Sequence, residues 1–178
     1  MADNIILIGF MGVGKGRVAR ALVERTGMYA IDTDDLIESK VNMKIRKIFQ
    51  LHGEPYFRQL EQQTADWLRE NVHNSIVSTG GGFFKVKHLG EQDTIVYLHS
   101  SLEKIVNSML AHPKAKKKIK KRPLLSDLKK ASELYEERLP LYRQVADFEV
   151  NVAKMNAEEV AAKIVKKLKL KKAKGKKK

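Results

Sequence analysis

A glycine-rich segment that ends in lysine carries the strongest chemical signal in this sequence of 178 residues. Residues 9–15 fit the pattern G-x4-G-K; an apolar, β-branched run precedes them and an amphipathic run follows. This order predicts a strand, a loop whose backbone N–H groups surround phosphate oxygens, and a helix whose positive end faces the same anion. Lys15 would add a cation for the β- and γ-phosphates; a glycine-rich turn without a ligand is the alternative. The residues expected to contact the nucleotide are Gly12, Val13, Gly14, Lys15, Gly16 and Arg17.

The residue after the lysine departs from the usual phosphate loop. That position normally holds Ser or Thr, whose hydroxyl ligates Mg²⁺, but Gly16 and then Arg17 stand here. Two interpretations remain open. Either the metal is held by phosphates, waters and a carboxylate elsewhere, or this chain binds nucleotide less well than a chain with the hydroxyl.

Two acids follow the second strand-like run. In an extended turn Asp32 would face the metal and the loop, whereas Asp34 would reach into the pocket as an acceptor, or base, for a hydroxyl nucleophile. The alternative is that these acids cap a helix over residues 35–38, and both interpretations can hold together.

Glycines and arginines supply further candidates. Gly80, Gly81 and Gly82 follow the third strand-like run, where such flexibility suggests that a substrate approaches the backbone closely. A flexible loop is the alternative. Isolated arginines occur at positions 58, 122 and 138; each could be a surface charge, but together they could clamp a carboxylate and neutralise phosphoryl charge.

Alternating elements are expected to position these residues. Strand-like runs occur at residues 5–8, 29–31, 75–78, 94–98 and 148–152, with helical periodicity between them. One helix should begin near Pro55, and one of its faces should be formed by Phe57, Leu60, Thr64, Trp67, Leu68 and Val72. Another should cover residues 155–170, with Asn156 as its N-cap. This alternation predicts a parallel sheet with helices on both faces and ligands at the carboxyl ends of its strands.

Six motifs together resemble the shikimate kinase family. They are Gly-Phe-Met-Gly-x-Gly-Lys, Asp-Thr-Asp-x-x-Ile-Glu, Gly-Glu-x-x-Phe-Arg-x-x-Glu, Ser-Thr-Gly-Gly-Gly, Arg-Pro-Leu-Leu and Arg-x-Pro-Leu-Tyr-x-x-x-Ala-Asp. They occur in this order, and the resemblance extends from about Ile5 to Leu168. It implies a three-layer α/β phosphate-loop kinase fold with a five-stranded parallel sheet and a mobile lid over about residues 112–125. The implied reaction transfers the γ-phosphoryl group of ATP to the 3-hydroxyl of shikimate, in aromatic amino-acid biosynthesis.

The resemblance also implies roles for the catalytic and metal-site residues. Lys15 and the loop would hold the ATP phosphates, and Asp32 would lie near Mg²⁺ and act on it through water. Asp34 would bind the shikimate hydroxyls and orient or deprotonate the nucleophile. Arg122 would arrive on the lid, contact ATP and stabilise the transferring group.

Shikimate itself would be bound by a second group of residues. By resemblance, Arg58 and Arg138 would grip its carboxylate with help from the Gly81 N–H, and Glu61 would hold Arg58 in place. Phe49 and Phe57 would wall the pocket, and the neighbouring glycines of residues 80–82 would line it. Two further departures from the family are Ser108, where an arginine often faces adenine, and a long, lysine-rich lid.

Composition sets the remaining expectations. The absence of cysteine fits a reducing cytoplasm, and neither a signal peptide nor a membrane-spanning run is visible. The net charge is +14, and nine lysines lie within the last thirteen residues. Because no aromatic residues interleave with these lysines, we interpret residues 171–178 as a disordered tail and not as a nucleic-acid arm. Residues 1–170 should form a single, monomeric kinase domain that binds neither nucleic acid nor membrane specifically. A basic nucleic-acid-binding module and another small-metabolite kinase are the rival interpretations.

Overall fold

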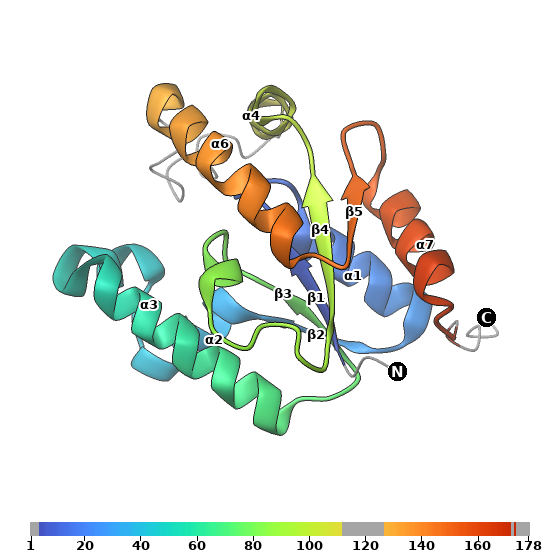
Figure 1. Ribbon diagram of the computed structural model, residues 1–178, viewed down its shortest axis with the longest axis horizontal. Helices are drawn as coiled ribbons and strands as arrows, with labels where there is room; N and C mark the ends of the chain where they lie inside the picture. The colour runs from blue at the N-terminus through green and yellow to red at the C-terminus, as the bar shows by residue number, and fades with distance from the viewer. Residues whose placement is uncertain (1–3, 112–126, 172, 174–178) are drawn as a thin grey trace.

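Helices and a central sheet form an α/β fold in the computed structural model, which describes residues 4–111, 127–171 and 173 (Figure 1). The elements are β1 (Ile5–Ile8), α1 (Lys15–Thr26), β2 (Tyr29–Asp32), α2 (Thr33–Val41), α3 (Ile45–Asn71), β3 (Ser75–Ser78), the 3₁₀ turn η1 (Phe83–Lys85), β4 (Thr94–His99), α4 (Leu102–Leu110), α6 (Leu128–Val145), β5 (Phe148–Asn151) and α7 (Ala157–Leu168).

The five strands run parallel in the order β2-β3-β1-β4-β5. The central strand β1 places Ile5 opposite both Ile76 and Thr94, and all four of its residues are buried. A strand covered on both faces reads as a continuous apolar run, which is why β1 could be recognised in the sequence. The predicted five-stranded parallel sheet is confirmed, and no predicted strand end differs from the observed one by more than one residue.

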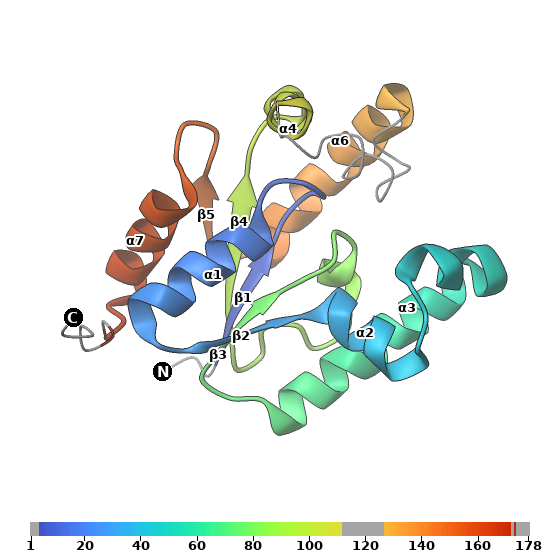
Figure 2. The ribbon, with the colours of Figure 1, turned by 180° about the vertical axis from the view of Figure 1, so that it is seen from behind.

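Helices cover both faces of this sheet. Figure 2 shows α1 and α7 in front of the strands, and the fully buried Leu22 and Ile164 contribute to the core from these two helices. On the opposite face, in front in Figure 1, α6 crosses β4. There Tyr97 and Tyr142 are fully buried and stack with their ring centroids 5.0 Å apart. The arrangement leaves the carboxyl ends of the strands accessible from the phosphate loop.

The long helix α3 is interrupted. Gly53 has φ 77° and ψ 179°, so the helix stops there and restarts with Pro55 in its first turn, as the sequence predicts. The expected apolar face is wrong at one position, because Trp67 is 47% exposed whereas Leu60, Thr64 and Leu68 are buried. Trp67 lies seven positions after Leu60 and about 20° away from it around the helix, so it stands at the edge of this face, where its large ring meets solvent.

The helices α7 and α2 each begin at a residue whose side chain caps the first turn. Asn156 caps α7 in a capping box with Glu159, as expected. The extended turn expected after β2 is wrong, since α2 begins at Thr33 immediately after the strand. Asp32 is the N-cap and accepts a hydrogen bond from the backbone N–H of Asp34, which satisfies an orphan donor of the first helical turn.

Three predictions fall outside the described residues in whole or in part. These are the lid over residues 112–125, Arg122 within it, and most of the lysine-rich tail. Among the helices that the structure describes, none combines the length and the apolar character needed to cross a membrane.

Candidate active site

The phosphate loop joins β1 to α1. A Cβ on Gly9 would lie 2.5 Å from the carbonyl oxygen of Leu98 on β4, so the loop can leave the sheet here only with glycine. Gly14 is the N-cap of α1 and has φ 111°, a backbone conformation that L side chains rarely adopt. The loop thereby turns sharply into the first turn of α1, whose positive dipole end favours an anion.

Lys15 lies over this loop. Its side chain is buried, and its Nζ donates hydrogen bonds to the carbonyl oxygens of Gly9 at 2.6 Å and Phe10 at 3.2 Å. The ammonium group also lowers the pKa of Asp34, which places a positive charge between the loop and the acidic cluster. This is the position from which a lysine can serve phosphate oxygens on one side and a reacting group on the other.

A cavity of about 420 Å³ adjoins the loop. It lies between the loop, α4 and the segment that joins β5 to α7, and its size is that of a small-molecule site. The predicted nucleotide-contact residues Gly12, Val13, Gly14 and Arg17 all line it. Ser108 lines it too, with Lys104 one helical turn away. The wall that α4 contributes to this cavity therefore carries Lys104 and Ser108, and Ser108 stands where the sequence resemblance leads to the expectation of an arginine.

The two acids after β2 have different surroundings. Asp32 is held by hydrogen bonds to both oxygens, from the Asp34 N–H at 3.0 Å and from the Ser78 hydroxyl at 2.9 Å. The Asp34 side chain is largely buried, and its Oδ1 has no hydrogen-bond partner among the described residues. Burial raises the pKa of Asp34 to about 6, with further contributions from the negative charges of Asp32 and Glu61. Asp34 is therefore mostly ionised at neutral pH, yet it holds a proton more readily than an ordinary aspartate and can accept one.

The three glycines after β3 allow close approach of these side chains. A Cβ on Gly80 would lie 2.7 Å from Asp34 Oδ1 and 3.3 Å from Glu61 Oε1. A Cβ on Gly82 would lie 2.2 Å from Arg58 Nη1. The glycine loop, residues 80–82, is therefore a surface over which two acids and an arginine converge.

Arg58 is fixed by acids on its own helix. It forms ion pairs with Glu54 and with the buried Glu61, so the predicted positioning contact of Glu61 is present. Burial raises the pKa of Glu61, and Arg58 opposes that rise. The guanidinium lies 5.5 Å from the Phe57 ring centroid, and Phe57 is 4.7 Å from the Phe49 ring. The predicted aromatic pair thus stands beside Arg58, with Phe57 buried and Phe49 partly exposed.

Arg138 approaches the glycine loop from α6. It is only 5% exposed, and its Nη1 donates a hydrogen bond of 2.9 Å to the Gly81 carbonyl. Its Nε is buried without a hydrogen-bond partner, and no carboxylate of the described residues forms an ion pair with it. The positive charge of Arg138 acts on the nearby carboxyls of Glu61 and Glu54 and favours their ionised forms, but neither carboxylate contacts it directly. An anionic ligand would supply the direct, charge-assisted partner that Arg138 lacks among the described residues.

Two residues of the site were missed by reasoning from the sequence. Tyr142 donates a hydrogen bond of 2.6 Å to the same Gly81 carbonyl, and burial raises its pKa to about 12, so it remains a donor. Ser78 holds Asp32. The motifs contained both letters, but neither partner could be read from spacing, because each contact joins segments far apart in the chain.

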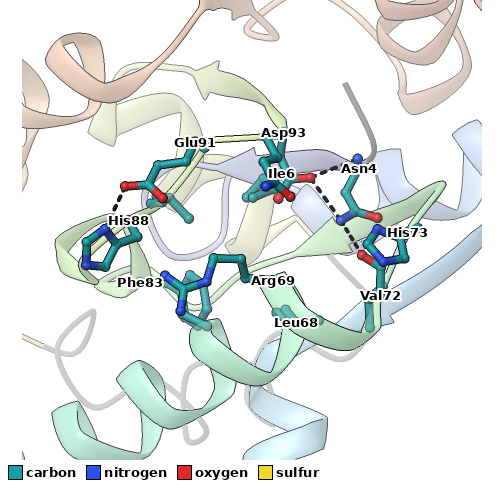
Figure 3. Close-up of a pocket in the computed structure, with 14 residues that line it drawn as sticks. Asn4, Ile6, Leu68, Arg69, Val72, His73, Phe83, His88, Glu91 and Asp93 are labelled. Carbon is teal, nitrogen blue, oxygen red and sulfur yellow. Dashed lines mark hydrogen bonds and ion pairs between the residues drawn. The ribbon is translucent and has the colours of Figure 1, made fainter. Parts of the chain in front are cut away.

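A second, smaller cavity lies at the opposite end of the strands (Figure 3). Its volume is about 30 Å³, the share of a single water molecule, which excludes a nucleotide. Asn4 bridges its walls by donating from Nδ2 to Val72 and to Asp93. We interpret this region as structural. Within residues 4–111, 127–171 and 173, no group of three or more His, Cys, Asp or Glu side chains is arranged to hold a metal ion.

Comparison with known proteins points to one family. The shikimate kinase family profile matches residues 11–169. A shikimate kinase of Helicobacter hepaticus is 36% identical over 163 residues, which cover 92% of this chain and 94% of that protein. A shikimate kinase of Sulfurihydrogenibium is 35% identical and covers 93% of this chain and 98% of its own length.

Solved structures agree with the sequence comparison. The shikimate kinase of Acinetobacter baumannii in complex with shikimate superposes with a TM-score of 0.79, at 30% identity, over 94% of this chain and 93% of that one. The Aquifex aeolicus shikimate kinase gives a TM-score of 0.75, also at 30% identity, over 93% and 96% of the two chains.

Proposed function

This chain belongs to the shikimate kinase family, and we propose that it carries out the family's reaction with the residues described above. The enzyme is an ATP-dependent kinase of the shikimate pathway. It transfers the γ-phosphoryl group of ATP to the 3-hydroxyl of shikimate and yields shikimate 3-phosphate and ADP. The roles of individual residues in this chain form the substance of the proposal.

The observation that carries the acceptor assignment is the buried Arg138 beside the glycine loop, which forms no direct ion pair among the described residues. Shikimate brings one carboxylate, which would supply that direct partner. Arg58 approaches the same loop from α3 and would contribute the second guanidinium. An acceptor without a carboxylate would leave Arg138 without a direct anionic partner, so the site favours an acid.

Asp34 lies where the hydroxyl must react. In the proposed step the shikimate oxygen attacks the γ-phosphorus, the bond from phosphorus to the bridging oxygen of ADP breaks, and Asp34 takes the hydroxyl proton. Its pKa of about 6 suits this task, because an acid of that strength is ionised at neutral pH yet retains affinity for a proton. Lys15 would then neutralise charge on the phosphates, and Arg122 would do so from the lid.

Magnesium is part of the proposal, and the local donor set fits it. Asp32 and Ser78 place a carboxylate and a hydroxyl oxygen beside the phosphate loop, and Mg²⁺ takes oxygen ligands while retaining several waters. When bound, the ion would neutralise the β- and γ-phosphate charge. The carboxylate of Asp32 is already oriented for this by its two hydrogen bonds.

The test is ADP release from Mg²⁺-ATP with and without shikimate. Turnover should depend on shikimate, and gluconate and AMP should not replace it. Gluconate carries a carboxylate on a flexible chain, whereas AMP offers a phosphate acceptor, so the pair tests other small-metabolite kinase activities. Turnover with either control but not with shikimate would overturn the assignment.

We also propose that the enzyme acts as a monomer in the cytoplasm, where ATP is available. Light scattering at assay concentrations tests this, and a dimer with unchanged activity on dilution would correct the oligomeric state only.

A further inference from the structure

The absence of a side chain at position 16 leaves space at the start of α1. A Cβ on Gly16 would meet only Arg20 Nη1 at 3.8 Å and Ser78 Oγ at 3.9 Å, both ordinary van der Waals distances. The backbone there is not in the left-handed region, so a serine would fit without strain. Ser78 Oγ, at the end of β3, is therefore the side-chain oxygen that lies beside the empty space at position 16.

The Ser78 hydroxyl is oriented for a second function. Its hydrogen is donated to Asp32 Oδ2 at 2.9 Å, so its oxygen lone pairs face away from that bond. Asp32 is itself fixed by the Asp34 N–H on its other oxygen. A hydroxyl and a carboxylate from neighbouring strands are thus coupled at the edge of the phosphate loop, and the side chain of Ser78 is shielded from bulk water.

We propose that Ser78 is a magnesium-positioning residue, which supplies from β3 the oxygen that Gly16 cannot supply from α1. This inference rests on the proposed kinase function. On this proposal β3 provides the hydroxyl in place of α1. The number of protein oxygens near the metal is then the same as in a phosphate loop that has Ser or Thr after the lysine. Ser78 acts on the ion directly or through a metal-bound water, in concert with Asp32.

A purely structural Ser78 makes different predictions. If its hydroxyl only joins the ends of β2 and β3, its removal lowers stability and leaves metal affinity unchanged. If Ser78 positions the metal, its removal weakens nucleotide binding only when Mg²⁺ is present. Affinity measured with and without the metal separates the two.

The experiment is calorimetric titration with ADP in Mg²⁺ and, separately, in EDTA. We expect Ser78→Ala to weaken binding about 10-fold in Mg²⁺ and to leave binding in EDTA unchanged. Electron paramagnetic resonance of Mn²⁺ in the ADP complex should show a matching loss of bound ion. Ser75→Ala is the matched control, because Ser75 is a buried serine at the other end of the same strand, where its hydroxyl donates to the His73 carbonyl, and it should change neither affinity.

A double substitution completes the test. Gly16→Ser in the Ser78→Ala background should restore most of the lost Mg²⁺-dependent affinity, because it returns a hydroxyl to the same space. Ser78→Cys keeps the side-chain size if the alanine variant folds poorly, and since sulfur is a poor Mg²⁺ ligand it should lose affinity similarly. The inference would be overturned if Ser78→Ala and Ser78→Cys weakened ADP binding in EDTA as much as they do in Mg²⁺. It would also be overturned if Gly16→Ser did not restore the Mg²⁺-dependent affinity. The kinase function itself would fail separately, through absence of shikimate-dependent turnover in the unmodified enzyme.

Discussion

The acceptor side and the nucleotide side of this site are built by different means. On the acceptor side, charged side chains are held by protein partners: Arg58 by two glutamates and Arg138 by the Gly81 carbonyl, with Asp34 buried close by. On the nucleotide side the protein offers the backbone of the phosphate loop, the buried Lys15 and an open cavity whose walls include Arg17 and Lys104.

The two halves therefore obtain their binding energy in different ways. The acceptor side is preorganised, and the protein sustains unfavourable electrostatics there, as the raised pKa of Asp34 shows. The nucleotide side relies on the anion to complete it, because loop N–H groups and Lys15 gain their strongest partners only from phosphate. Substitutions on the acceptor side should therefore alter stability and catalysis together, whereas those on the nucleotide side should alter affinity.

The largest effect is expected at Asp34. Asp34→Asn removes the proton acceptor and should lower kcat by about 1000-fold. It should also stabilise the fold by up to about 3 kcal/mol at neutral pH, since raising the pKa from 3.8 to about 6 costs the ionised form that much. The folded state binds the extra proton between these values, so the stability gain should vanish below about pH 4 and grow as pH rises to 6. Thermal melts across this range, together with kcat, measure both parts.

Asp35→Asn is the matched control, because Asp35 is the next residue on α2 and is exposed. It should leave kcat and the melting curve close to those of the unmodified enzyme. In the unmodified enzyme, kcat/KM should rise as pH increases through about 6, since only the ionised carboxylate accepts the proton. A flat profile from pH 5 to 8 would show that Asp34 positions the hydroxyl without acting as a base.

A smaller loss is expected when the buried cation is removed. Arg138→Met should raise the KM for shikimate about 100-fold, because the substrate carboxylate loses a desolvated partner worth about 3 kcal/mol. ADP affinity should stay the same, since the arginine faces the glycine loop and not the nucleotide cavity. Steady-state kinetics and ADP titration test this. Arg143→Met provides the control, because Arg143 pairs with Glu149 on the surface. An equal rise in the KM for shikimate with Arg138→Met and Arg143→Met would show that the effect is not specific to the acceptor side.

These expectations depend on parts of the site that differed in how well the sequence revealed them. The strands and the phosphate loop were readable, because burial on both faces demands apolar runs and the loop demands glycine at fixed offsets. The Asp34 environment was not readable, since the start of α2 at Thr33 and the approach of Glu61 follow from the topology. Likewise, Tyr142 meets Gly81 across 61 positions, a contact that no local spacing encodes.

The glycine loop allows a finer test of preorganisation. Gly82→Ala places a Cβ 2.2 Å from Arg58 Nη1, so the guanidinium must move, whereas a Cβ at Gly81 makes only ordinary contacts, at 3.5 Å. We expect Gly82→Ala to raise the KM for shikimate roughly 10-fold and Gly81→Ala to raise it less. The melting temperature of the Gly82→Ala variant should fall as well, because the displaced guanidinium disturbs the ion pair of Arg58 with the buried Glu61. The order of the two KM values is the measurement, and a reversed order would show that Arg58 is not fixed by this loop.

The smallest effect is expected from removal of residues 174–178, which contain four lysines. The last described residue, Ala173, donates its N–H to the Arg25 carbonyl at 2.8 Å, at the end of α1 that lies away from the phosphate loop. Ten helical residues, or about 15 Å, separate Arg25 from Lys15, and salt screens charges over such a distance. The truncated enzyme should therefore keep its kcat and both KM values. If the chain were a nucleic-acid-binding module, it would instead bind DNA in a salt-sensitive way, and truncation would weaken that binding. If truncation lowered turnover as well, the lysines would have to act on the nucleotide side. That side is built from loop backbone around an open cavity, so its affinity for the anionic nucleotide should respond to added positive charge more than the acceptor side does.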